Sequence, residues 1–241
     1  MGEWVLVTGG SQGIGRAIAR RCAAEGWRVL TFDREMPTDP LEGEEHRVVD
    51  LADAAATAAA LAEATDGRPI TRLVNNVGIV RPGALEDATL ADLDDVIALN
   101  LRCAIQCAQA VLPGMRATGM GRIVSIASRA MLGLPARTAY AAAKAALVGA
   151  TRSWAAELAP HGITANVVAP ASVDTPLWQT LNPPGSARRG KILDSVPMGR
   201  LATPEDVAQA VAFFLDARSG YVTGQVLFVC GGQSMGGATL F

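Results

Sequence analysis

The stretch VLVTGGSQGIG, residues 5–15, joins a short apolar run to the start of an amphipathic segment through glycines at positions 9, 13 and 15. Glycine lacks a Cβ, so it permits a tight turn and lets the backbone approach a bound group closely. The N-terminus of the helix that follows offers free N–H groups and the positive end of a dipole. The spacing is G-x-x-x-G-x-G rather than the general dinucleotide pattern G-x-G-x-x-G. The stretch therefore predicts a strand, a phosphate-binding loop and a helix in succession.

Short apolar runs alternate with longer Ala-rich stretches along the whole chain, a pattern typical of βαβ units around a parallel sheet. Helices are expected near residues 14–25, 53–65, 89–117, 137–159 and 204–216. No linker or low-complexity segment divides the sequence, so we expect one doubly wound α/β domain with seven strands. The expected strands are Trp4–Val7, Arg28–Phe32, His46–Val49, Arg72–Asn75, Arg122–Ile126, Thr164–Val168 and Gln225–Val229.

Composition narrows the function classes. Of the 241 residues, 50% are hydrophobic and 18% are charged, and the net charge is -2 with scattered cations, which argues against nucleic-acid binding. No apolar run approaches the roughly 20 residues that span a bilayer. The cysteines form no C-x-x-C pair and neither histidine lies in a ligand motif, so no metal site is expected. These features predict a cytoplasmic protein without a membrane or nucleic-acid partner.

An irregular, proline-rich segment follows the sixth expected strand, between Pro170 and Leu201. Ligands of open α/β sheets bind at the carboxyl ends of the strands, where this segment begins. We therefore expect a substrate lid around residues 171–201. The alternative is a surface excursion without a role in binding.

Asp33 ends the second expected strand, 20 residues after Gly13. An acidic side chain at this place can accept hydrogen bonds from the adenosine ribose hydroxyls, and it repels a 2′-phosphate. This position favours NAD(H) over NADP(H). Arg34 and Arg16 are the residues that could instead contact a phosphate, and a solvated strand end without a ligand is the remaining alternative.

Five motifs occur in one order: TGGSQGIG at 8–15, NNVG at 75–78, Asn100, Ser128 and Tyr-x-x-x-Lys at 140–144. Together they resemble the short-chain dehydrogenase/reductase family. The resemblance implies a Rossmann-like fold with a seven-stranded parallel sheet, a nicotinamide cofactor, hydride transfer between an alcohol and a carbonyl, and a homotetramer. The catalytic residues that it implies are Asn100, Ser128, Tyr140 and Lys144.

The chemistry of these residues can be argued independently. Hydride transfer to a ketone leaves charge on the oxygen, so a positioned acid must supply a proton. Tyr140 and Lys144 share one helix face, and a nearby ammonium would lower the phenol pKa, although such helical pairs are usually surface contacts. Ser128, with Ser125 as the alternative, follows the fifth strand and can hydrogen-bond the substrate oxygen. The family counterpart of Asn100 holds a water in a relay to the lysine; the alternative is a helix-interior polar residue.

The resemblance also implies a set of cofactor-binding residues. Ala171 and Val77 replace the usual Gly and Ala of two family motifs, which leaves the local geometry there open. The implied cofactor contacts are Gly9, Ser11, Gln12, Gly13, Ile14, Gly15, Asp33, Asp50, Leu51, Asn76, Gly78, Tyr140, Lys144, Pro170, Val173 and Thr175.

An NAD(P)-dependent oxidoreductase that interconverts a secondary alcohol and a ketone, with Tyr140 as general acid/base, is the function we expect. The alternatives are an NADPH-dependent 3-oxoacyl-thioester (acyl carrier protein) reductase, a dihydrodiol dehydrogenase and a non-catalytic nucleotide sensor. A basic cluster in the lid could receive an anionic substrate or be solvated surface charge. The candidate residues of the small-molecule pocket are Arg129, Met131, Leu134, Trp178 and Leu181, and the basic cluster comprises Arg188, Arg189 and Lys191.

Overall fold

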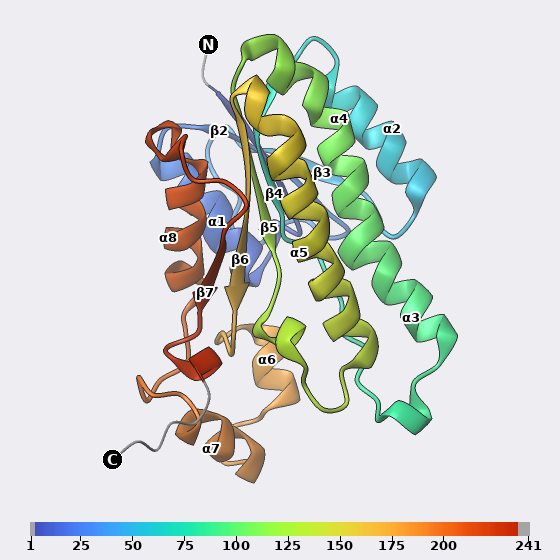
Figure 1. The fold of residues 1–241 in the computed structure, drawn as a ribbon, viewed down its shortest axis with the longest axis vertical. Helices are drawn as coiled ribbons and strands as arrows, with labels where there is room; N and C mark the ends of the chain where they lie inside the picture. Colours follow the sequence, from blue (N-terminus) through green and yellow to red (C-terminus); the bar gives the residue numbers. More distant parts are fainter. Residues whose placement is uncertain (1–2, 236–241) are drawn as a thin grey trace.

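The computed structural model describes residues 3–235. Seven parallel strands form one sheet in the order β3-β2-β1-β4-β5-β6-β7 (Figure 1). Every predicted strand is present, and no predicted strand end differs from the structure by more than two residues. The strands are β1 (Trp4–Thr8), β2 (Arg28–Asp33), β3 (Glu45–Val48), β4 (Ile70–Asn75), β5 (Gly121–Ile126), β6 (Ile163–Pro170) and β7 (Val226–Val229).

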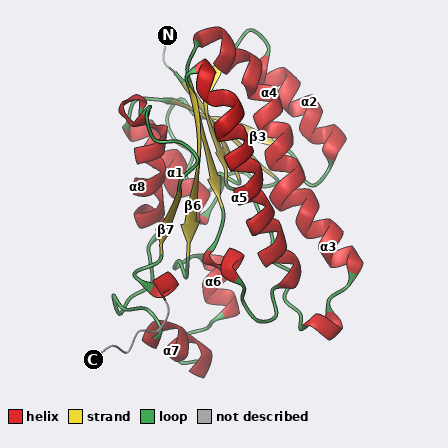
Figure 2. Ribbon diagram, viewed as in Figure 1, coloured by secondary structure: helices red, strands yellow, loops and turns green. Residues whose placement is uncertain are grey.

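Helices cover both faces of the sheet, as Figure 2 shows. One face carries α1 (Gly13–Ala24) and α8 (Pro204–Leu215), and the other carries α2 (Ala54–Thr65), α3 (Leu90–Ile97), α4 (Cys103–Thr118) and α5 (Thr138–Leu158). Side chains alternate between the faces along each strand. Val5 and Val7 of β1 therefore join the core beneath α1 and α8, whereas Leu6 joins the core on the opposite face. The structure thus confirms a single doubly wound α/β domain.

The expected helix at 89–117 is interrupted. A π-helical turn at Ala98–Arg102 separates α3 from α4, so Asn100 does not lie in a regular helix interior. The whole run Leu90–Thr118 is long and apolar enough to cross a membrane by length and composition alone. Its buried residues, among them Cys103, Cys107 and Met115, belong to the core between this run and the sheet. One side of this run therefore packs in the core of the domain.

The segment that the sequence describes as irregular contains two short helices, α6 (Pro176–Leu181) and α7 (Ala187–Asp194). Thr175 caps α6 by accepting a hydrogen bond from the N–H of Trp178 at 3.2 Å, and Pro176 occupies the first helical position. Proline is tolerated in a first turn because that N–H has no helical partner. Both helices lie beyond the carboxyl ends of the strands (Figure 1).

Candidate active site

A cavity of about 320 Å³ opens at the carboxyl ends of the strands, between the end of β5, the start of α5 and the segment that carries α6 and α7. In open α/β sheets this edge is where ligands bind. Half of the predicted site residues line it: Ile14, Asn76, Gly78, Ser128, Tyr140, Lys144, Pro170, Val173 and Thr175.

The glycine loop beside this cavity has the shape that a dinucleotide pyrophosphate requires. Gly9 and Gly13 have φ values of +69° and +55°, which L side chains rarely adopt. A Cβ on Gly15 would collide with the carbonyl oxygen of Gly9. Gln12 precedes α1 but makes no side-chain cap, and the first turn holds no acidic residue. The N–H groups at this end of α1 are therefore free for an anion, so the residues present fit a nicotinamide dinucleotide.

Asp33 is held against the glycine loop. Its Oδ2 accepts hydrogen bonds from the backbone N–H of Ser11 at 3.0 Å and from the Ser11 hydroxyl at 2.5 Å. The carboxylate thus has a fixed direction at the end of β2. Asp50 is exposed and accepts from the N–H of Ala52 at 2.9 Å, whereas Leu51 is buried in the hydrophobic core, so the structure assigns the Leu51 side chain to packing.

Asn76 ties the end of β4 to the glycine loop. Its Nδ2 donates to the carbonyl oxygens of Thr8 and Gly9 at 2.9 and 3.1 Å. The Thr8 hydroxyl in turn accepts from the N–H groups of Asn76 and Val77 at 3.0 and 3.1 Å. Sequence reasoning missed this positioning role of Thr8, because its partners lie more than 65 residues away. The Val77 side chain packs against the core.

Tyr140, Lys144 and Ser128 meet at the cavity. The Lys144 Nζ lies 5.7 Å from the centre of the Tyr140 ring and donates to the carbonyl oxygen of Ile126 at 2.8 Å. Burial lowers the pKa of Lys144 to about 8. Burial also raises the pKa of Tyr140, while a hydrogen bond with Ser128 and the charge of Arg137 act in the opposite direction. The expected lowering of the Tyr140 pKa is therefore wrong, because desolvation of the phenolate outweighs the hydrogen bond with Ser128 and the charge of Arg137.

Asn100 reaches the same place from the π-helical turn. Its Nδ2 donates to the carbonyl oxygens of Ile79 and Val96 at 3.0 and 2.9 Å, which fixes the side chain. Its Oδ1 is buried and has no hydrogen-bond partner within residues 3–235. A Cβ on Gly78 would collide with this oxygen and lie 3.3 Å from the Lys144 Nζ. The oxygen and the ammonium are thus close enough for one water to bridge them.

The remaining predicted residues lie at the start of the segment 171–201, where the sequence predicts a lid. Val173 pairs with Ala202 in an isolated parallel bridge, and the N–H of Asp174 donates to the Ala202 carbonyl at 2.8 Å. Thr175 lies beside Gly13, whose Cβ position is 3.6 Å from the Thr175 Cγ2. Ala171, which replaces the family glycine, lines the cavity itself. Over the part of the chain that the structure describes, no group of three His, Cys, Asp or Glu side chains could hold a metal.

Comparisons with known proteins identify the family. A family profile described as enoyl-(acyl carrier protein) reductase matches residues 9–234. The chain is 41% identical to (2S)-[(R)-hydroxy(phenyl)methyl]succinyl-CoA dehydrogenase subunit BbsD of Thauera aromatica, over 95% of this chain and 96% of the relative. It is 36% identical to the 3-oxoacyl-(acyl-carrier-protein) reductase FabG of Vibrio harveyi, over 97% and 98% of the two chains.

A solved structure from Beutenbergia cavernae, provisionally described as an NAD(P)-dependent gluconate 5-dehydrogenase with NADP bound at low occupancy, has the same fold. The TM-score is 0.89 at 37% identity, and the similarity covers 98% of each chain. The sheet order, the glycine loop and these matches over nearly the full length agree with one another. The chain therefore belongs to the short-chain dehydrogenase/reductase family and is an NAD(P)-dependent oxidoreductase that interconverts an alcohol and a carbonyl compound.

Proposed function

We propose that Tyr140 is the proton donor and acceptor of this reaction and that the substrate is a secondary alcohol or its ketone. The observation that carries the proposal is the convergence of Tyr140, Lys144 and Ser128 on one cavity, with the orphaned oxygen of Asn100 behind them. A bound nicotinamide supplies or accepts the hydride. Every other part of the chemistry falls to side chains of this chain.

Each side chain has a distinct part. Ser128 donates a hydrogen bond to the substrate oxygen and so orients the carbonyl. Tyr140 transfers the proton at its phenol oxygen: it donates the proton when a ketone is reduced and accepts it when an alcohol is oxidised. Lys144 and Asn100 replace the proton through a bridging water. The glycine loop, Asp33 and Thr175 would hold the cofactor, and the segment at 171–201 closes over the substrate as a lid.

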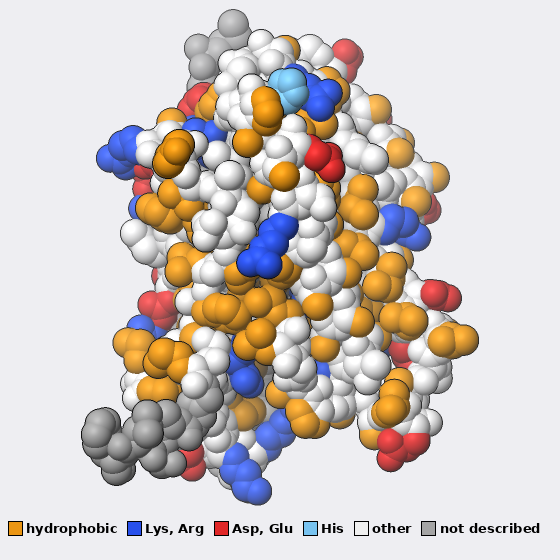
Figure 3. Space-filling view, in the orientation of Figure 1, with side chains coloured by type: hydrophobic (Ala, Val, Ile, Leu, Met, Phe, Trp, Pro, Cys, Tyr) orange, Lys and Arg blue, Asp and Glu red, His pale blue; other side chains and the backbone are white. Residues whose placement is uncertain are grey.

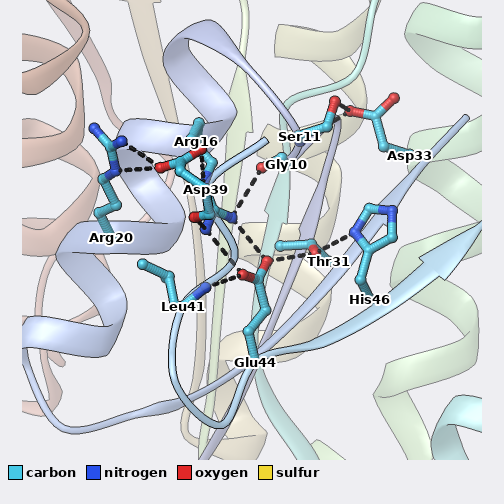
Figure 4. Close-up of polar contacts among 10 residues, drawn as sticks. All are labelled: Gly10, Ser11, Arg16, Arg20, Thr31, Asp33, Asp39, Leu41, Glu44 and His46. Atoms are coloured by element: carbon cyan, nitrogen blue, oxygen red, sulfur yellow. Dashed lines mark hydrogen bonds and ion pairs between the residues drawn. The ribbon is translucent and has the colours of Figure 1, made fainter. Parts of the chain in front are cut away.

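The cofactor preference in this proposal is NAD(H). Asp33 faces the loop in a fixed direction, where its charge repels a 2′-phosphate. Arg16, which could have bound that phosphate, is 4% exposed and pairs with Glu44 at 2.8 Å. Figure 4 shows that Glu44 also accepts hydrogen bonds from Thr31 and from the N–H of Leu41. The two terminal nitrogens of the Arg16 guanidinium are thus already engaged inside the protein, with Glu44 and the Asp39 carbonyl.

Titration with NADH and NADPH tests this preference. We expect NADH to bind at least about tenfold more tightly than NADPH, and Asp33→Asn to reduce that ratio by about tenfold, which corresponds to about 1.4 kcal/mol. Glu35→Gln is the matched control, because it removes the same charge two residues away on an exposed side chain. Equal affinities in the wild type, or an equal effect of the control, would contradict the proposal.

A second candidate activity is the reduction of 3-oxoacyl thioesters with NADPH, because the FabG relative bears that name and covers the chain almost completely. Oxidation of secondary alcohols and diols with NAD⁺ is compared with reduction of a 3-oxoacyl thioester by NADPH and by NADH. Faster turnover of the thioester with NADPH would replace the first proposal. Cofactor binding without turnover on any of these compounds would instead indicate a nucleotide sensor.

The assembly is proposed to be a homotetramer and its location the reducing cytoplasm. Support for assembly comes from the small exposed side chains of α5 and from β7, the edge strand of the sheet, where Leu227 is 40% exposed. Figure 3 shows hydrophobic side chains gathered between β7 and α5. Light scattering after gel filtration gives the mass directly. The free thiols of Cys103 and Cys107, 4.0 Å apart, support a reducing location.

A further inference from the structure

Among residues 3–235, four cationic side chains line the cavity, and no aspartate or glutamate does. One of them, Lys144, belongs to the catalytic set proposed above. The other three are Arg129, which follows Ser128, Arg137, which precedes α5, and Arg188 on α7. The wall of the cavity around the reacting groups is therefore positively charged. In Figure 3, Lys and Arg side chains are also visible at the end of the molecule where α6 and α7 lie.

These three arginines lack carboxylate partners. Eleven other arginines form ion pairs with Asp or Glu. Within the described residues none of the three does so, and the side chain of Arg137 donates only to the carbonyl oxygen of Ala136, at 2.7 Å. Arg189, the neighbour of Arg188, does not line the cavity; it stacks over Trp178 at 4.9 Å and donates to the Asn182 carbonyl. Eight arginines in residues 3–235 lack a carboxylate partner, and three of them line the cavity.

Arg137 and Arg188 act on each other. Burial lowers the pKa of Arg137, and the charge of Arg188 lowers it further. Two like charges on one wall repel each other, and an anion between them would relieve the repulsion. The guanidinium of Arg137 also lies close enough to Tyr140 to lower the phenol pKa. An anionic group held by Arg137 would therefore sit next to the reacting carbonyl.

The backbone holds Arg137 in this position at a cost. Ala136 has a φ of +58°, and it is the only residue other than glycine in 3–235 with a positive φ. Its carbonyl accepts from the N–H of Gly83 at 3.2 Å as well as from the Arg137 side chain. Strained backbone persists where surrounding contacts fix it and is frequent at ligand sites. The strained residue lies directly before Arg137. Its conformation supports a ligand-binding role for this turn.

We propose that the substrate carries a carboxylate, which Arg137 and Arg188 bind from two sides, while Arg129 adds a third positive charge. The planar guanidinium matches a carboxylate through two parallel hydrogen bonds. One wall of the cavity is apolar, so the substrate is a hydroxy acid or oxo acid with an apolar body. The apolar wall comprises Leu134, Leu177, Trp178 and Leu181. This inference rests on the function proposed above and names its substrate class.

Binding of a matched pair of probes tests the inference without turnover. Phenylacetate and phenylacetamide share an apolar body and differ in charge, and calorimetry measures the binding of each to the protein with NADH. We expect phenylacetate to bind at least about tenfold more tightly than the amide. Arg137→Gln and Arg188→Gln should each remove most of that difference, and Arg137→Lys should retain part of it. Lys191→Gln, the same charge change on an exposed side chain of the same helix outside the cavity, should change nothing.

Several results would overturn the inference. They are equal binding of the two probes, no binding of phenylacetate to the wild type, or an equal loss in Lys191→Gln. Inorganic phosphate that competes with phenylacetate more strongly than acetate does would indicate a phosphate site instead. Turnover of neutral alcohols with no preference for hydroxy acids over their methyl esters would refute only this inference. Carboxylate binding without turnover of any alcohol would refute only the proposed function. Circular dichroism confirms that each variant is folded.

Discussion

Lys144→Met should relieve the free-energy cost of a buried charge and at the same time abolish turnover. Lys144 is 3% exposed, and burial lowers the pKa of its ammonium from 10.5 to about 8. One unit of pKa difference between the folded and unfolded protein corresponds to about 1.4 kcal/mol. The charged side chain therefore lowers the free energy of unfolding by about 3 kcal/mol near neutral pH. Methionine removes this charge at similar volume, and it also removes the ammonium of the proposed proton relay, so turnover should be lost.

The pH dependence isolates this effect. Between the folded pKa of about 8 and the unfolded pKa of 10.5, the unfolded chain binds more protons at Lys144 than the folded chain. The free energy of unfolding of the wild type therefore rises with pH through this window. Relative to Lys144→Met it should rise by about 2 kcal/mol from about pH 7 to about pH 9.5. The variant also leaves the Ile126 carbonyl without its donor, which costs about 1–3 kcal/mol but equally at every pH.

Urea unfolding followed by circular dichroism, without cofactor and at several pH values, measures both proteins. Lys191→Met is the matched control, because Lys191 is exposed on α7 and its charge is hydrated in both states. The difference between wild type and Lys144→Met should change with pH, and the difference for the control should not. A constant difference for Lys144→Met would refute the reasoning, since it would mean that the ammonium is not desolvated in the folded protein.

Three further substitutions probe the site. Tyr140→Phe should abolish turnover while NADH fluorescence titration gives a nearly unchanged affinity; residual turnover near the wild-type rate would exclude Tyr140 as proton carrier. Asn100→Ala removes the buried Oδ1 and should lower kcat by about 100-fold without weakening NADH binding, because it interrupts proton transfer rather than cofactor contact. An unchanged kcat would argue against the water relay. Gly15→Ala should abolish NADH binding because the new Cβ meets the carbonyl oxygen of Gly9, whereas Gly149→Ala, where nothing lies within 4 Å, should preserve it. Equal NADH affinity in both glycine variants would disprove the close-packing argument.

The regular parts of the fold were predictable from the sequence because they depend on local pattern. Strands such as β1 and β6 are buried along their full length, so their apolar runs predict them. The π-helical turn at Ala98–Arg102 has no such signal, since its residues also suit a regular helix. Helices α6 and α7 were not predicted, because prolines that begin or flank short helices resemble loop residues. Local pattern thus predicts the elements but not their interruptions.

Some residues of the candidate site were also predictable from the sequence, whereas contacts between distant residues were not. The positions of Tyr140, Lys144 and Ser128 followed from the family resemblance, because a Tyr–Lys spacing of four residues is ordinary on a helix. The pair of Arg16 and Glu44 could not be predicted, since its members are 28 residues apart and no local pattern joins them. The basic cluster at 188–191 was visible in the sequence, but only the structure separates Arg188, which lines the cavity, from Arg189 and Lys191, which do not.

Among the described residues, no acidic side chain lines the cavity. The same fact explains the lowered pKa of Lys144 and the proposed preference for an anionic substrate. A carboxylate beside Lys144 or Arg137 would stabilise the cofactor-free protein, but a ligand would then have to displace it before binding. Without that carboxylate the cations remain unpaired, and their burial lowers both pKa values. Negative charge supplied by a ligand is bound by the folded chain only, so it adds its binding free energy to stability. Substrate charge and protein stability are therefore coupled through the same cavity, and the chain is least stable when the site is ready to bind.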